Sequence, residues 1–182
     1  AGIFAWRAGV FGGPRSSGNS VAVLPFKNVG GDQDQAYFSD GLSEELRATL
    51  ARNEKLQVMA QASSATFRES NDDAITIASK LGVAYLLEGS VRRSGEILRI
   101  TSDLIDGSTG FSRWSETFDR VMQDIFAIQI EIANSVASKI GAKVGSSDGS
   151  NAGTDPPEAT PGATTSLAAY DAYLRGRALY DL

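Results

Sequence analysis

The chain has 182 residues, with 17 Lys and Arg against 22 Asp and Glu, a formal net charge of −5 and 42% apolar residues. Because it contains no His and no Cys, it cannot build a Ser-His-Asp triad, an imidazole or thiolate metal site, a thiol nucleophile or a disulfide. Proteins that bind a phosphate backbone usually have an excess of basic residues, whereas this chain has an excess of acidic residues. We therefore expect no nucleic-acid partner.

The first residues form a segment of their own. Residues 1–11 are apolar except for Arg7, but a helix needs about 20 residues to cross a bilayer. Trp6 and Arg7 are residue types favoured where a membrane helix leaves the hydrocarbon. Two interpretations stay open, an ordinary floppy terminus and the trailing end of a membrane anchor. We therefore predict a juxtamembrane or flexible leader over residues 1–19.

The central region, residues 20–144, has the patterns of one α/β domain. Alternating apolar residues predict strands, and apolar residues three or four apart predict helices. In chain order the predicted elements are strand 21–26, helix 36–53, strand 56–60, an irregular or helical turn 63–68, helix 71–82, strands 83–91, 96–106 and 111–118, and helix 122–142. Together they predict a mixed five-stranded sheet with about three packed helices, in which the early strands run parallel and the last strands antiparallel.

Helix and turn boundaries follow from capping chemistry. Ser39 or Asp40 is the expected cap of the first helix, and Asn71 that of the second. Gly82 is the expected left-handed stop of the second helix, and Ser94–Gly95 predicts a tight turn between two antiparallel strands.

The end of the chain changes composition twice. Residues 145–165 hold three of the five prolines and no apolar periodicity, which predicts a disordered linker. Residues 166–182 resume helical spacing through Leu167, Tyr170 and Leu174. Because a lone helix of this length is marginal in water, we expect this face to dock on its own domain or on a neighbouring chain. The long linker favours the neighbouring chain.

Three segments in order resemble the TolB-like amino-terminal domain: SVAVLPFKNVGGDQDQAYFSDGLSEEL, LGVAYLLEGSVRRSGEILRITSDLIDGSTGFSRWSETFDR and DIFAIQIEIANSVASKI. The resemblance covers residues 20–144 and implies a fold like that of TolB. In multidomain bacterial proteins this module typically follows a membrane helix. A nucleotide cyclase or a winged-helix DNA-binding domain precedes that helix, and tetratricopeptide (TPR) repeats follow the module. The resemblance therefore implies that residues 166–182 are the start of a TPR-like region.

The glycine-rich loop after the first strand is a candidate site without a phosphate-binding pattern. Residues 28–32 match neither GxxxxGK[ST] nor GxGxxG, and Asp32 stands where a phosphate would require a cation or a bare amide. Asp32 and Asp34 lack the further ligands that calcium needs at regular spacing. We expect solvated carboxylates there.

Two further groups have a structural and a functional interpretation. Tyr37 and Phe38 precede the expected cap, where they can pack back on the helix or present an aromatic contact to a partner. Arg92, Arg93 and Arg99 cluster around a predicted hairpin. They either protect a strand edge or form a basic patch for a partner.

No spacing of acids, bases and oxyanion donors predicts an active site, so we expect a non-enzymatic chain without cofactor or metal. The predicted function is a periplasmic sensory or protein-interaction module of a membrane-tethered bacterial signalling protein, anchored in the inner membrane through an upstream segment. A cytoplasmic location, a homodimer, and a small-ligand domain using loops near residues 28–32 and 61–66 are alternatives. The candidate contact residues are Asn28, Gly30, Gly31, Asp32, Tyr37, Phe38, Arg92 and Arg93.

Overall fold

The computed structural model describes residues 17–30, 36–144 and 166–180. Most of the predicted leader and all of the predicted linker 145–165 lie outside these residues. The elements are β1 (Ser20–Val23), β2 (Lys27–Asn28), α1 (Ala36–Ala51), β3 (Gln57–Val58), α2 (Gln61–Ala65), α3 (Ala74–Leu81), β4 (Tyr85–Ser94), β5 (Ile97–Asp106), β6 (Ser112–Val121), a 3-10 turn (Met122–Asp124), α4 (Ile125–Val144) and α5 (Leu167–Tyr180).

The strands form one mixed sheet in the order β3-β1-β4-β5-β6, and the short β2 pairs with β4 outside that path. β1 runs parallel to both β3 and β4, whereas β4, β5 and β6 form an antiparallel meander. The predicted mixed sheet of five ordered strands is therefore confirmed. Two-residue β2 is an addition that the sequence patterns did not predict.

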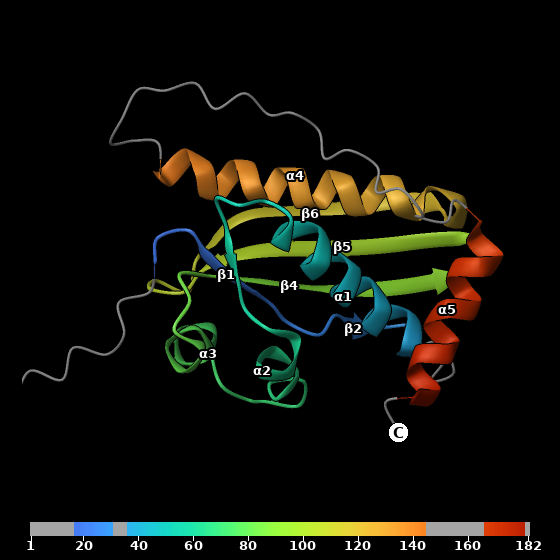
Figure 1. The fold of residues 1–182 in the computed structure, drawn as a ribbon, viewed down its shortest axis with the longest axis horizontal. Helices are drawn as coiled ribbons and strands as arrows, with labels where there is room; N and C mark the ends of the chain where they lie inside the picture. Colours follow the sequence, from blue (N-terminus) through green and yellow to red (C-terminus); the bar gives the residue numbers. More distant parts are fainter. Residues whose placement is uncertain (1–16, 31–35, 145–165, 181–182) are drawn as a thin grey trace, which may run out of the picture.

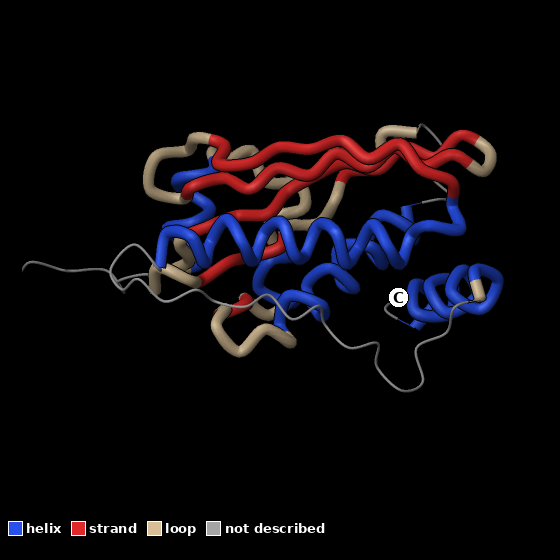
Figure 2. Tube along the Cα trace, turned by 90° about the horizontal axis from the view of Figure 1, so that it is seen from above, coloured by secondary structure: helices blue, strands red, loops and turns tan. Residues whose placement is uncertain are grey.

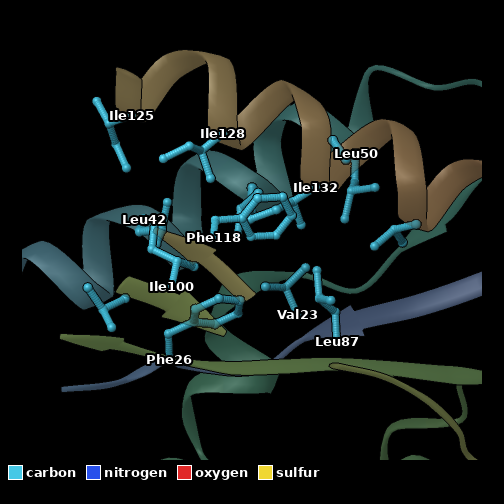
Figure 3. Packing of buried hydrophobic residues seen from close by; sticks show 14 of the residues in the cluster. Val23, Phe26, Leu42, Leu50, Leu87, Ile100, Phe118, Ile125, Ile128 and Ile132 are labelled. Carbon is cyan, nitrogen blue, oxygen red and sulfur yellow. The ribbon is translucent and has the colours of Figure 1, made fainter. Parts of the chain in front are cut away.

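The main core lies between the sheet and the layer of α1 and α4, which Figure 1 and Figure 2 show running across one face of the strands. α4 contributes one stripe of residues three or four apart, which places them on the same side of the helix. Figure 3 shows part of this cluster, in which Phe26 and Leu87 of the sheet side meet Leu42 of α1 and Ile132 of α4. The buried α4 stripe is Ile125, Ile128, Ile132, Val136 and Ile140.

A smaller cluster covers only part of the opposite face. Ile77 and Ala78 of α3 pack with Leu86 of β4 and Ile105 of β5. Farther along β4, β5 and β6, the side chains on this face are polar, charged or exposed. We call this part the open face; its central residues are Ser90, Arg92, Ile97, Arg99, Thr101, Thr117, Asp119 and Val121.

Two predicted caps were wrong, and one stop was confirmed. α1 begins at Ala36, so Ser39 and Asp40 lie inside the helix, and the Ser39 hydroxyl donates to the Ala36 carbonyl. The N-cap of α3 is Asp73, whose carboxylate accepts from the Thr76 N–H at 2.7 Å, rather than Asn71. Gly82 ends α3 with φ at 67°, as expected.

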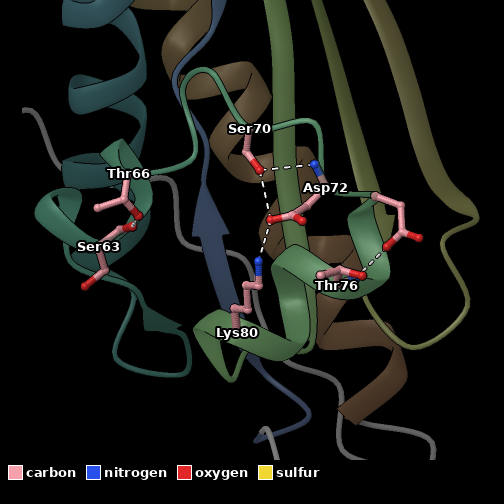
Figure 4. A network of polar contacts seen from close by, with 7 residues as sticks. Ser63, Thr66, Ser70, Asp72, Thr76 and Lys80 are labelled. Atoms are coloured by element: carbon pink, nitrogen blue, oxygen red, sulfur yellow. Dashed lines mark hydrogen bonds and ion pairs between the residues drawn. The ribbon is translucent and has the colours of Figure 1, made fainter.

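Side-chain hydrogen bonds hold the segment that precedes α3 in place. The Ser70 hydroxyl donates to Asp72, and Lys80 pairs with the same carboxylate at 2.6 Å (Figure 4). These contacts place the acidic residues before the helix, near its positive end.

The sheet has two ends with different neighbours. At the Gly95 end, β4 turns into β5, and α5 lies beside the start of α1 and of α4 (Figure 1). At the Gly110 end, β5 turns into β6, and the chain enters through Ser17 and Ser20.

Candidate functional site

Two groups of candidate residues predicted separately lie together at the Gly95 end. Asn28 is in parallel register with Val91, and the Val29 N–H donates to the Val91 carbonyl at 2.9 Å. A Cβ atom on Gly30 would lie 3.6 Å from the Arg93 backbone nitrogen, so the loop runs along the end of β4. Gly31 and Asp32 lie outside the described residues.

The two candidate arginines point to different sides. The Arg93 side chain is half-buried, and its Nε donates to the Gly95 carbonyl at 3.1 Å, which stabilises the turn. Arg92 is exposed on the open face, directly opposite Arg99. β4 lies inside the sheet, so the interpretation of Arg92 and Arg93 as protection of an outer strand is wrong.

Arg99 and Arg92 differ in their ion pairing. Arg99 binds Asp119 through two hydrogen bonds of 2.6 and 2.9 Å, and the pKa of Asp119 is lowered by the hydrogen bond from Arg99. Arg92 forms no ion pair with any residue that the structure describes. Like charges directly opposite each other on a sheet destabilise it, so an external anion near Arg92 would relieve this repulsion.

An exposed aliphatic pair borders the two arginines. Ile97 of β5 and Val121 of β6 are directly opposite each other and are 49% and 41% exposed. Because residues two apart on a strand share a face, this pair lies on the same side as Arg99 and Asp119. Charge beside exposed aliphatic surface is typical of protein-interaction surfaces.

The last helix docks on its own domain. Tyr170 and Leu174 of α5 are buried in the main core. Phe38 of α1 and Phe126 of α4 meet the Tyr170 ring edge-on at centroid distances of 6.4 and 4.9 Å. The Gln129 amide donates to the Tyr170 hydroxyl at 2.8 Å. Of the two expected docking modes, the structure shows the one within a single chain.

Tyr37 connects α1 to the same helix. Its hydroxyl donates to Asp171 at 2.6 Å and accepts from Arg175 at 3.2 Å. The Arg175 guanidinium also lies 5.5 Å from the centre of the Tyr37 ring. Partial burial, together with the hydrogen bond to Asp171, raises the pKa of Tyr37. The two aromatic candidates, Tyr37 and buried Phe38, thus both contact α5.

The described residues contain no candidate metal centre. Within these ranges no group of three or more His, Cys, Asp or Glu side chains is placed to hold a metal ion. The Glu44 carboxylate is paired with Arg47 at 2.6 Å. In the described part of the chain, no helix combines the length and apolar content needed to span a membrane.

Sequence comparison gives the family. The profile of the HilA/YgeH-like transcriptional regulator, second domain, matches residues 17–135. The chain belongs to this family. A curated protein of Rhizobium meliloti (strain 1021), named "Putative adenylate cyclase 3", is 43% identical over 117 residues, which are 64% of this chain and 20% of that protein. The chain thus spans about a fifth of the length of this curated relative.

Solved structures similar to this HilA/YgeH-like domain share its fold. TolB from Acinetobacter baumannii matches with a TM-score of 0.53 and 13% identity, over 72% of this chain and 30% of that one. Lipoprotein GNA1162 from Neisseria meningitidis matches with a TM-score of 0.50 and 19% identity, over 64% of this chain and 98% of that one. The expected resemblance to the TolB amino-terminal domain is confirmed at the level of fold.

Sequence reasoning missed three residues of this region. Gly41 lies inside α1, where glycine is unfavourable. A glycine at such a position indicates that another segment packs closely against the helix. Gln129 interrupts the apolar stripe of α4, and its polar side chain signalled a buried partner. Val121 gave no local signal, because only strand register brings it beside Ile97.

Proposed function

We propose that this HilA/YgeH-like domain is a non-enzymatic sensory and protein-interaction module that relays binding through α5 to the region that follows it. The observation that carries the proposal is the docking of α5 on α1 and α4 through Tyr170 and Leu174. A change in the packing of α1 or α4 would alter the surface on which this helix docks. Membership of a regulator family and a relative named as a cyclase support a regulatory role.

The partner surface in this proposal is the Gly95 end of the open face. Arg92 offers a guanidinium without an ion pair among the described residues, and Ile97 and Val121 offer aliphatic area. The partner would be an acidic protein segment whose carboxylate binds Arg92 and whose aliphatic side chain covers Ile97. Arginine suits this role because its planar fork binds a carboxylate through two hydrogen bonds.

The proposal extends to the parent protein. It would be tethered in the inner membrane upstream of this domain, carry a cyclase or DNA-binding output domain in the cytoplasm, and continue after α5 into TPR repeats. The apolar composition of residues 1–11 supports the tether. The domain would lie in the periplasm, with the cytoplasm as the alternative. An alkaline phosphatase fused after residue 182 of the parent would be active only if the domain is periplasmic.

The experiment that tests the interaction surface compares Arg92→Glu with Lys139→Glu in the parent protein. Arg92→Glu replaces a repulsive cross-strand pair by an attractive one, so the free domain should be at least as stable as before. Signal output, measured as cyclic nucleotide or as reporter transcription, should nevertheless fall. Lys139 is exposed on α4, so Lys139→Glu changes the charge equally and should leave output unchanged. Unchanged output with Arg92→Glu would contradict the proposed surface.

A second function, small-ligand binding near residues 61–66, is favoured by one observation. Ser64 of α2 is buried, and its hydroxyl has no hydrogen-bond partner in the described residues. A bound polar ligand would satisfy it. Thermal-shift screening of the chain against metabolites, repeated with Ser64→Ala, tests this alternative. A stabilising compound whose effect survives Ser64→Ala would argue against this site.

A further inference from the structure

We propose that the Gly110 end of the domain contacts a lipid surface through Phe111 and Ile75. Phe111 is 74% exposed and Ile75 is 45% exposed. The β5–β6 turn lies against α3, because a Cβ atom on Gly110 would lie 3.4 Å from Ile75 Cγ1. The inference deepens the proposed function, because it rests on the tether and assigns the side of the domain that faces the membrane.

The exposed phenylalanine is held by an ordered turn. The Asp106 N–H donates to the Phe111 carbonyl at 2.9 Å, and the Gly110 N–H donates to the Asp106 carbonyl at 2.7 Å. The buried Asp106 carboxylate accepts from the Ser108 N–H at 3.0 Å and pairs with Arg113 at 3.5 Å. The aromatic ring is therefore presented to solvent by a fixed backbone, which lowers the entropic cost of binding.

The chain enters the domain at this same end. The Ser20 hydroxyl accepts from the Ala84 N–H at 2.9 Å, and the Ala84 carbonyl accepts from the Gly107 N–H at 2.8 Å. Ala84 thus hydrogen-bonds both to Ser20, at the start of β1, and to Gly107, in the turn before Phe111. Five residues, 12–16, separate the apolar segment 1–11 from Ser17 and span at most about 18 Å. Lipid bound by the apolar segment would lie within reach of this turn.

Two cations and one carboxylate, that of Glu54, are exposed in the loop beside the entry point. Arg52 and Lys55 are exposed and form no ion pair with the described residues. The Lys55 carbonyl accepts from the Asn19 side chain, which places that loop beside the entering chain. Cations near a membrane surface are attracted by anionic lipids, and an aromatic ring is favoured at the headgroup level. Other occupants, a second copy or residues 1–11, lack this combined support.

The test uses the absence of cysteine from the chain. Thr109→Cys, beside Phe111, and Glu96→Cys, at the opposite end, each receive an environment-sensitive NBD fluorophore. The labelled chains are mixed with vesicles of phosphatidylcholine alone or with phosphatidylglycerol. A blue shift at position 109 but not at 96, greater on anionic vesicles, is expected. Phe111→Ser in the Thr109→Cys chain should weaken vesicle binding about tenfold and remove the shift.

Each other outcome counts against the inference. Sedimentation with vesicles without a shift at position 109 means that residues 1–11 bind lipid alone, which overturns the inference and leaves the tether intact. If the fluorophore at position 109 is already blue-shifted before vesicles are added, protein covers the turn. Light scattering then separates a second copy, seen as a dimer, from the chain's own residues. Failure to bind vesicles at all contradicts the inference, whereas the tether, which the proposed function places upstream of this domain, is tested separately by the phosphatase fusion.

Discussion

Gly41 of α1 and Leu174 of α5 approach so closely that a Cβ atom on residue 41 would lie 2.2 Å from Leu174 Cδ2. Glycine inside a helix costs about 1 kcal/mol relative to alanine. Its place in α1 is explained by the contact, because any side chain there would force the Leu174 side chain out of its position.

Gly41→Ala should therefore release α5 without unfolding the sheet. Two further Leu174 side-chain atoms would lie 2.9 and 3.0 Å from the new Cβ, so the whole side chain must move, at a cost of about 1–3 kcal/mol. Hydrogen exchange should become faster in residues 166–180 and stay slow in β4 and β5. Leu174→Ala should relieve the clash, so the double variant should lose less than the sum of both changes. Unchanged protection of α5 in Gly41→Ala would contradict this account.

Tyr170→Phe should weaken the same docking through hydrogen bonding. The buried Gln129 amide would lose its acceptor at 2.8 Å, and a buried unsatisfied donor costs about 1–3 kcal/mol. Adding Gln129→Leu removes the donor and should restore most of the loss. Denaturant titration of both variants measures the effect. Equal stability of Tyr170→Phe and the native chain would show that water satisfies Gln129.

Alkaline pH should loosen α5. Burial raises the pKa of Tyr170 above its ordinary value of 10.0, and burial together with the Asp171 hydrogen bond raises that of Tyr37. A raised folded pKa means that the stabilisation is complete below pH 10 and is lost as pH rises toward the folded pKa. Exchange in residues 166–180 should accelerate above pH 10 relative to the rest of the chain. In the Tyr37→Phe, Tyr170→Phe double variant this extra acceleration should disappear.

Gly89→Ala should destabilise the sheet, whereas Gly141→Ala should not. A Cβ atom on Gly89 would lie 2.3 Å from the Thr101 carbonyl oxygen and 2.5 Å from Phe26 Cε2, and a backbone oxygen cannot move aside as a side chain can. We expect a loss of about 1–3 kcal/mol. Apart from its chain neighbours and the backbone of its own helix, no atom of the described residues lies within 4 Å of the corresponding position on Gly141. There alanine should stabilise α4 by up to about 1 kcal/mol, as thermal unfolding of both variants will show.

Local chemistry in the sequence determined most of the elements. The α4 stripe, the left-handed Gly82 and the β4–β5 hairpin each depend on residues a few positions apart, so their patterns could be read directly. The caps of α1 and α3 were misread, because several polar residues near each boundary can act as a cap and only the folded backbone selects one.

Tertiary structure alone decided what the candidate residues do. Parallel pairing places Asn28 beside Val91, and no local pattern encodes the register of strands so far apart in the chain. This pairing of β2 with β4 therefore places Arg92 on an inner strand of the sheet. Tertiary structure also decided that α5 packs on its own domain, because the fit of Leu174 against Gly41 depends on three-dimensional shape. Periodicity could show that the helix needs a partner, but only close packing could select which surface it covers.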